Sequence, residues 1–242
     1  MPPDILIVCD ARPVNATVTQ LEVPVMAVPE AARQLGIPVT TLRHWLDGHR
    51  IGDRLYEPVL RVEPIATADI TWGELVEADY LRSYRLKGVS LQKLRLFVQT
   101  CRERFGMRYP LAHLMPFTDG RKLLLELQRD AALTDRLRIV YRLDDGQLEL
   151  DHRTESWLER VDWGADHDVA LRLHPDGIGS PVVHDPGIAS GAATVHGVRT
   201  EIVREQYEVG EDTRDIAETF GLSLADVLAA LSHENRMRPL AA

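Results

Sequence analysis

The stretch "PEAARQLGIPVTTLRHWLDG" (residues 29–48) has the spacing of two short helices joined by a tight turn. Ala32 lies four residues before Gly36, and the apolar residues Leu42 and Trp45 follow that glycine by six and nine positions. Pro29 suits the first turn of a helix, where its missing N–H group is not needed. The side chains expected to face inward are Ala31, Ala32, Leu35, Leu42, Trp45 and Leu46. This arrangement is that of a helix-turn-helix.

The residues after this stretch, "GHRIGDRLYEPVLRV", predict a two-stranded hairpin with its turn at Gly52–Asp53. Residues 24–62 therefore indicate a winged helix-turn-helix. In such a unit the second helix enters the major groove of DNA, where base edges are read by hydrogen-bond donors and acceptors. The side chains that we predict to contact DNA are Thr40, Thr41, Arg43 and His44 from the helix, and Arg50 and Arg54 from the hairpin.

A second stretch, "TRDIAETFGLSLADVLAALSHE" (residues 213–234), repeats the same spacing but shows a different surface. Its outward positions hold Ser223, Leu224, Ala225, Leu228 and Ala229, which cannot read base edges. The nearby acidic residues Asp215, Glu218 and Asp226 would repel phosphates. A helix that is apolar on both faces is normally buried against a partner. This unit therefore predicts a packing module, with Leu224 and Leu228 as the contact of a homodimer.

The remaining pattern completes an α+β fold with a winged head, extra helices, a small central β region and a C-terminal helix-turn-helix-like domain. Two helices are expected within residues 72–88 and 90–106, the second capped by Ser90. Short β-like runs follow in "RKLLLEL" (121–127), "RLRIVYRLDDGQLEL" (136–150, with a turn at Asp145–Gly146) and "HDVALRLHP" (167–175), with a short helix at "TESWLERV" (154–161). Residues 175–198 read as a linker that becomes a small hairpin, and the helical pattern resumes from Arg199.

The expected boundaries divide the chain into five segments. These are an N-terminal strand or arm (1–23), the DNA-binding domain with its basic helices (24–110), a β-rich middle region (111–178), the C-terminal domain (179–236) and a tail (237–242).

Charge is unevenly distributed along the 242 residues, whose formal net charge is −9. Residues 80–110 hold eight basic residues and one acidic residue, a net charge of +7, whereas residues 199–235 carry −6. The candidates for contacting phosphate or an acidic partner are Arg82, Arg85, Lys87, Lys93 and Arg95. The alternative is that this basic segment is simply a solvated helix face.

From the sequence we expect a cytoplasmic protein. No apolar run approaches the roughly 20 residues of a membrane span, and the first residues lack the pattern of a signal peptide. Cys9 and Cys101 lie far apart without partner histidines, which favours a reducing compartment and argues against a disulfide or zinc site.

The segment "GIPVTTLRHWLDG" resembles the MerR-type and excisionase-type winged helices, whose recognition helix carries Thr-Leu-Arg followed by aromatic residues. Here these positions are Thr41, Leu42, Arg43, His44 and Trp45, with His44 where MerR proteins often have Tyr.

Residues 185–234 resemble the family called domain of unknown function 433. The residues that match its pattern are Pro186, Gly191, Gly197, Arg199, Thr200, Gly210, Ile216, Ala217, Leu222, Val227, Ala230 and Leu231. Glu208 and Val209 depart from the small residue usual before the turn glycine. The middle stretch at residues 88–127 is similar to longer, mycobacterial-type members that join a MerR-like head to this tail.

This resemblance implies an antitoxin of a VapBC-like pair, which neutralises a PIN-type ribonuclease toxin by direct binding and represses its own operon at operator DNA. PIN-type toxins hold Mg²⁺ with clustered carboxylates, so an inhibitor needs cations or a blocking segment. Arg236 and Arg238, expected beyond the last helix, are candidates for toxin binding, as is the basic segment. The alternative is that the two arginines only solvate the chain end. No catalytic residue, cofactor, metal or membrane partner is expected.

Two other function classes stay open at this point. An enzyme would have to use the histidine and aspartate residues of 166–185, whose spacing fits no metal motif; these are His167, Asp168, His174, Asp176, His184 and Asp185. A MerR-like, ligand-sensing transcriptional regulator would bind a small molecule in residues 110–175.

Overall fold

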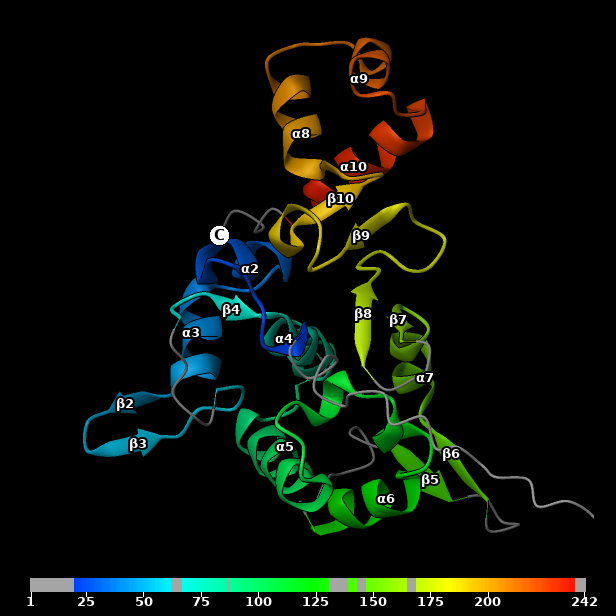
Figure 1. Ribbon diagram of the computed structural model, residues 1–242. Helices are drawn as coiled ribbons and strands as arrows, with labels where there is room; N and C mark the ends of the chain where they lie inside the picture. Colours follow the sequence, from blue (N-terminus) through cyan, green and yellow to red (C-terminus); the bar gives the residue numbers. More distant parts are fainter. Residues whose placement is uncertain are drawn as a thin grey trace, which may run out of the picture.

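The computed structural model describes residues 20–61, 67–86, 88–130, 139–142, 147–164 and 169–237 (Figure 1). Helices and strands are mixed along the chain, as the α+β expectation requires. Several predictions fall outside the described residues: the N-terminal strand with Cys9, Lys87, the Asp145–Gly146 turn, His167, Asp168 and Arg238.

The N-terminal part consists of β1 (Pro24–Met26), α2 (Val28–Gln34), α3 (Val39–Asp47) and a hairpin of β2 (His49–Ile51) and β3 (Arg54–Tyr56). All six side chains expected to face inward are buried, so that prediction is confirmed. Gly36 adopts a φ of +59° in the turn between the helices, a conformation that favours glycine. The hairpin projects beside α3, away from the body of the molecule (Figure 1).

The helix α4 (Trp72–Arg85) lies at the centre of the fold. It begins after β4 (Ile70–Thr71), which pairs antiparallel with β1, and Thr71 and Glu74 form a reciprocal capping box. Every residue from Trp72 to Leu81 is buried, because α5 (Leu91–Phe105), the short helices η1 (Pro110–Ala112) and η2 (Met115–Phe117), and other elements surround the helix. Ser90 caps α5 by accepting a hydrogen bond from the Lys93 amide, as predicted.

The segment "RKLLLEL" is a helix and not a strand, so that prediction was wrong. It forms most of α6 (Arg121–Asp130), which buries Leu124, Leu125, Leu127 and Gln128. Leu, Glu, Gln and Lys are all good helix formers, and the inward residues recur at helical spacing. The following strands β5 (Val140–Arg142) and β6 (Leu148–Leu150) pair as predicted, and α7 (His152–Leu158) is the expected short helix.

A five-stranded antiparallel sheet joins the middle of the chain to its C-terminal part. Its order is β11 (Val198–Arg199), β10 (Ala193–Val195), β9 (Val182–His184), β8 (Ala170–Leu173) and β7 (Val161–Trp163). The hairpin of β10 and β11 was predicted, but β9 lies in the stretch that we interpreted as a linker, and this was wrong. Val182 and His184 alternate inward with Val183 between them, which is the period of a half-buried strand. The sheet therefore runs across residue 178.

The C-terminal helices are α8 (Thr200–Glu208), α9 (Thr213–Phe220) and α10 (Leu224–Met237). Buried apolar side chains of the described residues form two clusters, one from Leu21 to Leu173 and one from Val182 to Leu231. Because α10 continues to Met237, Arg236 lies inside the last helix and not beyond it, which corrects the prediction. At its end, the Met237 sulfur lies 3.8 Å from the position that a β-carbon on Gly36 would take.

The end of α10 packs against α2 through polar contacts. Glu234 forms an ion pair with Arg33 at 2.8 Å and accepts a hydrogen bond from Thr200 at 2.6 Å. His233 Nδ1 lies 2.9 Å from Asp176 Oδ2, and its Nε2 lies 3.4 Å from the Gln34 amide oxygen. The two helix-turn-helix-like units, far apart in the sequence, therefore meet in the fold.

Candidate functional site

Helix α3 presents a polar outer face. Its inner face is occupied by Leu42, Trp45 and Leu46, so the intervening residues must point away from the core. Thr40, Arg43 and His44 are exposed and Thr41 is half-buried. Arg50 and Arg54 of the hairpin are also exposed. The six predicted DNA contacts thus lie on one helix and the adjoining hairpin, with hydrogen-bonding groups available to a ligand.

A stack of aromatic rings connects α3 to the hairpin, and this contact was not predicted from the sequence. His44 stacks on His49 with ring centroids 4.0 Å apart, and His49 stacks on Tyr56 at 4.7 Å. The guanidinium of Arg54 lies 5.0 Å from the Tyr56 ring centroid, within cation–π range. Alternation within the two paired strands could have placed His49 opposite Tyr56. The stack fixes the orientation of the hairpin relative to the helix.

The ring at the centre of this stack stays neutral more readily than an ordinary histidine. Burial lowers the pKa of His49, and the nearby charges of His44 and Arg95 lower the pKa further. A neutral His49 can pack between His44 and Tyr56 without adding a third charge to Arg54 and Arg95.

The basic segment of residues 80–110 does not form one open face. Arg102 forms an ion pair with the buried Glu77 at 2.7 Å and donates hydrogen bonds to the carbonyl groups of Val59 at 2.6 Å and Leu60 at 3.0 Å. Arg108 pairs with Glu22 at 3.1 Å. The net charge of +7 counted along the segment therefore overstates its exposed charge, because Glu77 and Glu22 outside the segment pair with two of its arginines.

The remaining candidate cations lie around the head. A side chain at Gly36 would meet the Arg82 guanidinium at 3.3 Å, so Arg82 lies over the turn between α2 and α3. Arg85 donates a hydrogen bond to the Val89 carbonyl. Burial lowers the pKa of Arg95 while Glu57 opposes the shift, which places Arg95 beside the end of the hairpin. Lys93 is half-buried on α5.

The outward face of α10 carries the residues predicted for a homodimer contact. Leu224 is 42% exposed and Leu228 is 53% exposed. Asp226 is held at the start of the helix, where it accepts hydrogen bonds from Ser223; these bonds lower the pKa of Asp226 although burial opposes the shift. This surface carries apolar and acidic groups, whereas the outer face of α3 carries polar and basic ones.

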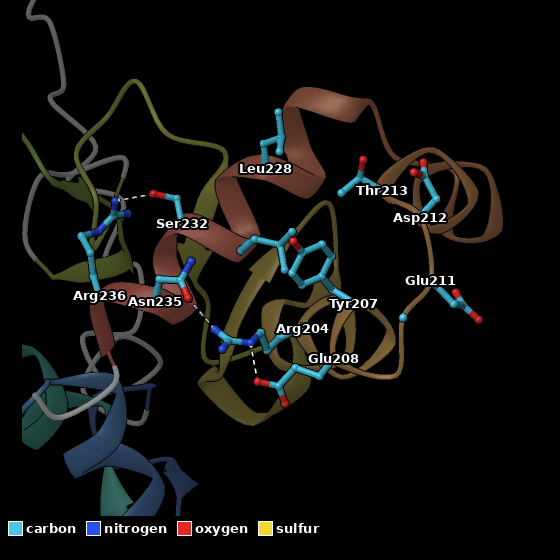
Figure 2. A pocket seen from close by; sticks show the side chains of 12 residues that line it. Arg204, Tyr207, Glu208, Glu211, Asp212, Thr213, Leu228, Ser232, Asn235 and Arg236 are labelled. Carbon is cyan, nitrogen blue, oxygen red and sulfur yellow. Dashed lines mark hydrogen bonds and ion pairs between the residues drawn. The ribbon is translucent and has the colours of Figure 1, made fainter. Parts of the chain in front are cut away.

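A groove lies between α8, the connection to α9, and α10. It has a volume of about 1140 Å³. Figure 2 shows Tyr207 of α8 between the two helices, Leu228 further along α10, and Glu211 and Asp212 on the connection. This groove was not predicted from the sequence. Its walls come from three elements, and no local sequence pattern predicts how these elements are placed relative to one another.

Both arginines that line the groove are engaged within the chain. Arg204 pairs with Glu208 at 2.8 Å and donates a hydrogen bond to Asn235 at 2.8 Å (Figure 2). Arg236 forms an ion pair with Asp176 at 2.6 Å and donates to Ser232 at 2.7 Å. Toxin binding by Arg236 stays a prediction, but its guanidinium already has an acidic partner.

The histidines considered for an enzyme have structural partners. His184 Nδ1 lies 2.8 Å from the Gly191 carbonyl oxygen, and His174 pairs with Asp162 at 3.2 Å. Among the described residues, no group of three histidine, cysteine or acidic side chains could hold a metal ion. In the same part of the chain, no helix has both the length and the apolar character needed to cross a bilayer.

Comparisons with known proteins show relatives along almost the whole chain. No family model matches it, so the MerR-type and domain of unknown function 433 resemblances stay predictions. The chain is 29% identical over 227 residues to "Uncharacterized protein Rv2308" of Mycobacterium tuberculosis, covering 91% of this chain and 94% of the relative. It is 25% identical over 233 residues to "Putative antitoxin VapB45" of the same organism, covering 88% and 96%.

The fold is also found in a solved structure. The crystal structure of Rv2018 from Mycobacterium tuberculosis superposes with a TM-score of 0.70 at 24% sequence identity, covering 88% of this chain and 99% of that one. The chain therefore shares the fold of Rv2018 over most of its length.

Proposed function

We propose that this chain is a cytoplasmic antitoxin that binds and neutralises a PIN-type ribonuclease toxin and represses its own operon by binding operator DNA. The observation that carries the proposal is the alignment with "Putative antitoxin VapB45", which extends over 96% of that protein and 88% of this chain. A match of this extent reaches into both the N-terminal head and the C-terminal domain. The proposal gives the chain no catalytic activity, cofactor or metal of its own.

The surface of the head supports the DNA-binding half of the proposal. Thr40, Arg43 and His44 of α3 are exposed beside the hairpin, as a winged helix-turn-helix that reads DNA would require. Such units bind two half-sites as symmetric dimers, so a homodimer is part of the proposal. The exposed Leu224 on α10 is available for the dimer contact.

The antitoxin half is tested by expressing the protein encoded by the gene adjacent to this one, with and without this chain. We expect the neighbour alone to arrest growth and cleave RNA, and co-expression to restore growth with formation of a stable complex. Arrest that persists beside abundant folded chain, without complex formation, would overturn the antitoxin role.

The DNA-binding half is tested by an Arg43→Ala substitution. A side chain that reads a base edge contributes about 1–3 kcal/mol, so we expect affinity for the DNA upstream of the gene to fall about 5- to 150-fold. Fluorescence anisotropy with labelled duplexes measures this change. The control is Arg214→Ala, which removes an exposed arginine from α9 in the second unit.

The control variant decides which of the two units reads DNA. Arg214→Ala should bind the duplex as the unsubstituted chain does. Equal losses for both variants would contradict the assignment of DNA recognition to α3.

A further inference from the structure

We propose that the groove between α8 and α10 is the docking site for a basic amphipathic segment of the partner toxin. This inference rests on the proposed antitoxin function and specifies which surface holds the toxin and what chemistry it recognises. It assigns toxin binding to a groove in the C-terminal domain, whereas the sequence prediction assigned it to Arg236 and Arg238.

Apolar side chains line the groove and are only partly covered. Tyr207 is 51% exposed and Leu228 is 53% exposed, whereas Leu231 beneath them is 8% exposed. Figure 2 shows Tyr207 pointing into the space between the helices and Leu228 further along α10. Burying one such side chain fully contributes about 1.5–3 kcal/mol, so these two residues are suitable anchors for a bound helix or strand.

The charge of the groove selects a cationic occupant. Its own cations, Arg204 and Arg236, are each paired with a carboxylate of the chain. Glu211 and Asp212 are exposed on the connection between α8 and α9. Asp212 accepts a hydrogen bond from the Arg214 amide at 2.8 Å, at the start of α9. The rim therefore carries a net negative charge that lysine or arginine side chains would complement.

The same charges disfavour a second copy of this chain in the groove. A two-fold dimer places the same patch of each subunit against its mate, so Glu211 and Asp212 would face their own copies. Like charges brought together in an interface cost several kcal/mol. A nucleic acid is disfavoured for the same reason, since its phosphates would meet the acidic rim.

Two apolar residues of the C-terminal domain provide a matched pair of test variants. Leu228 of α10 lines the groove, whereas Ile202 of α8 is also exposed but does not line it. Leu228→Lys removes an apolar anchor and adds a charge that repels a basic segment. Ile202→Lys also replaces an exposed apolar side chain with lysine, but outside the groove.

The experiment measures binding of the purified full-length variants to the protein encoded by the adjacent gene. We expect Leu228→Lys to weaken the complex at least about 10-fold, which corresponds to about 1.4 kcal/mol, and Ile202→Lys to bind within twofold of the unsubstituted chain. The double variant Glu211→Gln/Asp212→Asn keeps side chains that can cap α9 but removes both charges. It should bind more weakly at low salt and show a flatter salt dependence. Thermal unfolding of each variant confirms that it is folded.

The outcomes separate this inference from the proposed function. If the unsubstituted chain fails to bind the neighbour, both are overturned. If it binds and Leu228→Lys binds equally well, only the groove assignment is overturned. If Leu228→Lys becomes monomeric while its toxin affinity is unchanged, the groove is a homodimer contact and the inference is also overturned.

Discussion

His184 is a buried histidine whose environment opposes its protonation. Burial lowers the pKa of His184 to about 4, although the hydrogen bond with the Gly191 carbonyl acts in the opposite direction, and the neighbouring His233 lowers the pKa further. The two rings lie 6.3 Å apart in an edge-on arrangement. The fold is therefore built around a neutral His184 at the point where β9 meets α10.

Stability should consequently fall in mildly acidic solution. The unfolded chain takes up a proton at this residue near pH 6.5, whereas the folded chain does so only near pH 4. The free energy of unfolding is unaffected above pH 6.5 and decreases by up to about 3 kcal/mol as the pH falls through this window. Urea unfolding at about pH 7 and about pH 5 measures the difference.

A substitution at His184 identifies the source of this effect. His184→Gln should be less stable at neutral pH but lose much of the dependence on pH, while the exposed His152→Gln should keep it. Equal slopes for all three proteins would show that another group titrates. Asp176 is not that group, because hydrogen bonds from His233 and Arg236 outweigh its burial and lower the pKa of its carboxyl below 3.8.

At the residue scale, the sequence predicted which side chains of α3 face outward, because helical period alone decides that. It could not predict that Arg102 is internal. Its partner Glu77 lies 25 positions earlier on another helix, and both carry the charge pattern of surface residues. Burial of an ion pair depends on tertiary packing, and a count of charges along the chain does not contain it.

At the element scale, α4 departs from the usual preference of helices for alanine. Gly73 lies in its first turn, and a β-carbon there would meet the Tyr109 ring at 2.6 Å. Gly73→Ala would gain about 1 kcal/mol of helix propensity but would force the Tyr109 ring out of the core.

We therefore expect Gly73→Ala to lower the free energy of unfolding by about 1–3 kcal/mol. Denaturant titration measures the change, and Gln92→Ala at an exposed position of α5 is the control. A more stable Gly73→Ala protein would show that Tyr109 moves aside without loss.

The helix α6 shows why one element type was mispredicted. Its three consecutive leucines fit a short buried strand as well as a helix, and period does not separate the two over seven residues. In the structure, Gln128 of α6 joins the helix to the next strand. Its side-chain oxygen accepts hydrogen bonds from the Ile139 and Val140 amides at 3.0 and 3.1 Å. This contact requires the helix and β5 to be already side by side.

At the scale of the whole molecule, the C-terminal part is not an independent appendage. The sheet crosses residue 178, and Arg33 of the head pairs with Glu234 of α10 across 201 positions of sequence. Gly191 approaches Val25 so closely that a β-carbon would lie 2.9 Å from the valine. No local pattern predicts contacts at such separations, so the sequence identified both units but not their association.

A fragment of residues 1–178 should therefore be less stable than the full chain. It would lose β9, leaving the edge of β8 unpaired, and it would expose Val25 and leave Arg33 without Glu234. We expect a lower Tm and concentration-dependent aggregation, measured by thermal unfolding and light scattering. Residues 1–237, which retain all three C-terminal helices, should behave as the full chain; a fragment as stable as that control would contradict this account.

The helix α10 has one set of residues in the groove and another set in contact with the head or its neighbours. Leu228, Ser232 and Asn235 line the groove, whereas His233, Glu234 and Met237 meet the head or its neighbours. Each residue turns an α-helix by about 100°, so inserting or deleting one residue between Leu228 and Ser232 would rotate Leu228 away from the groove while the later residues kept their contacts. Any natural variation in this helix must then conserve its length as strictly as its composition.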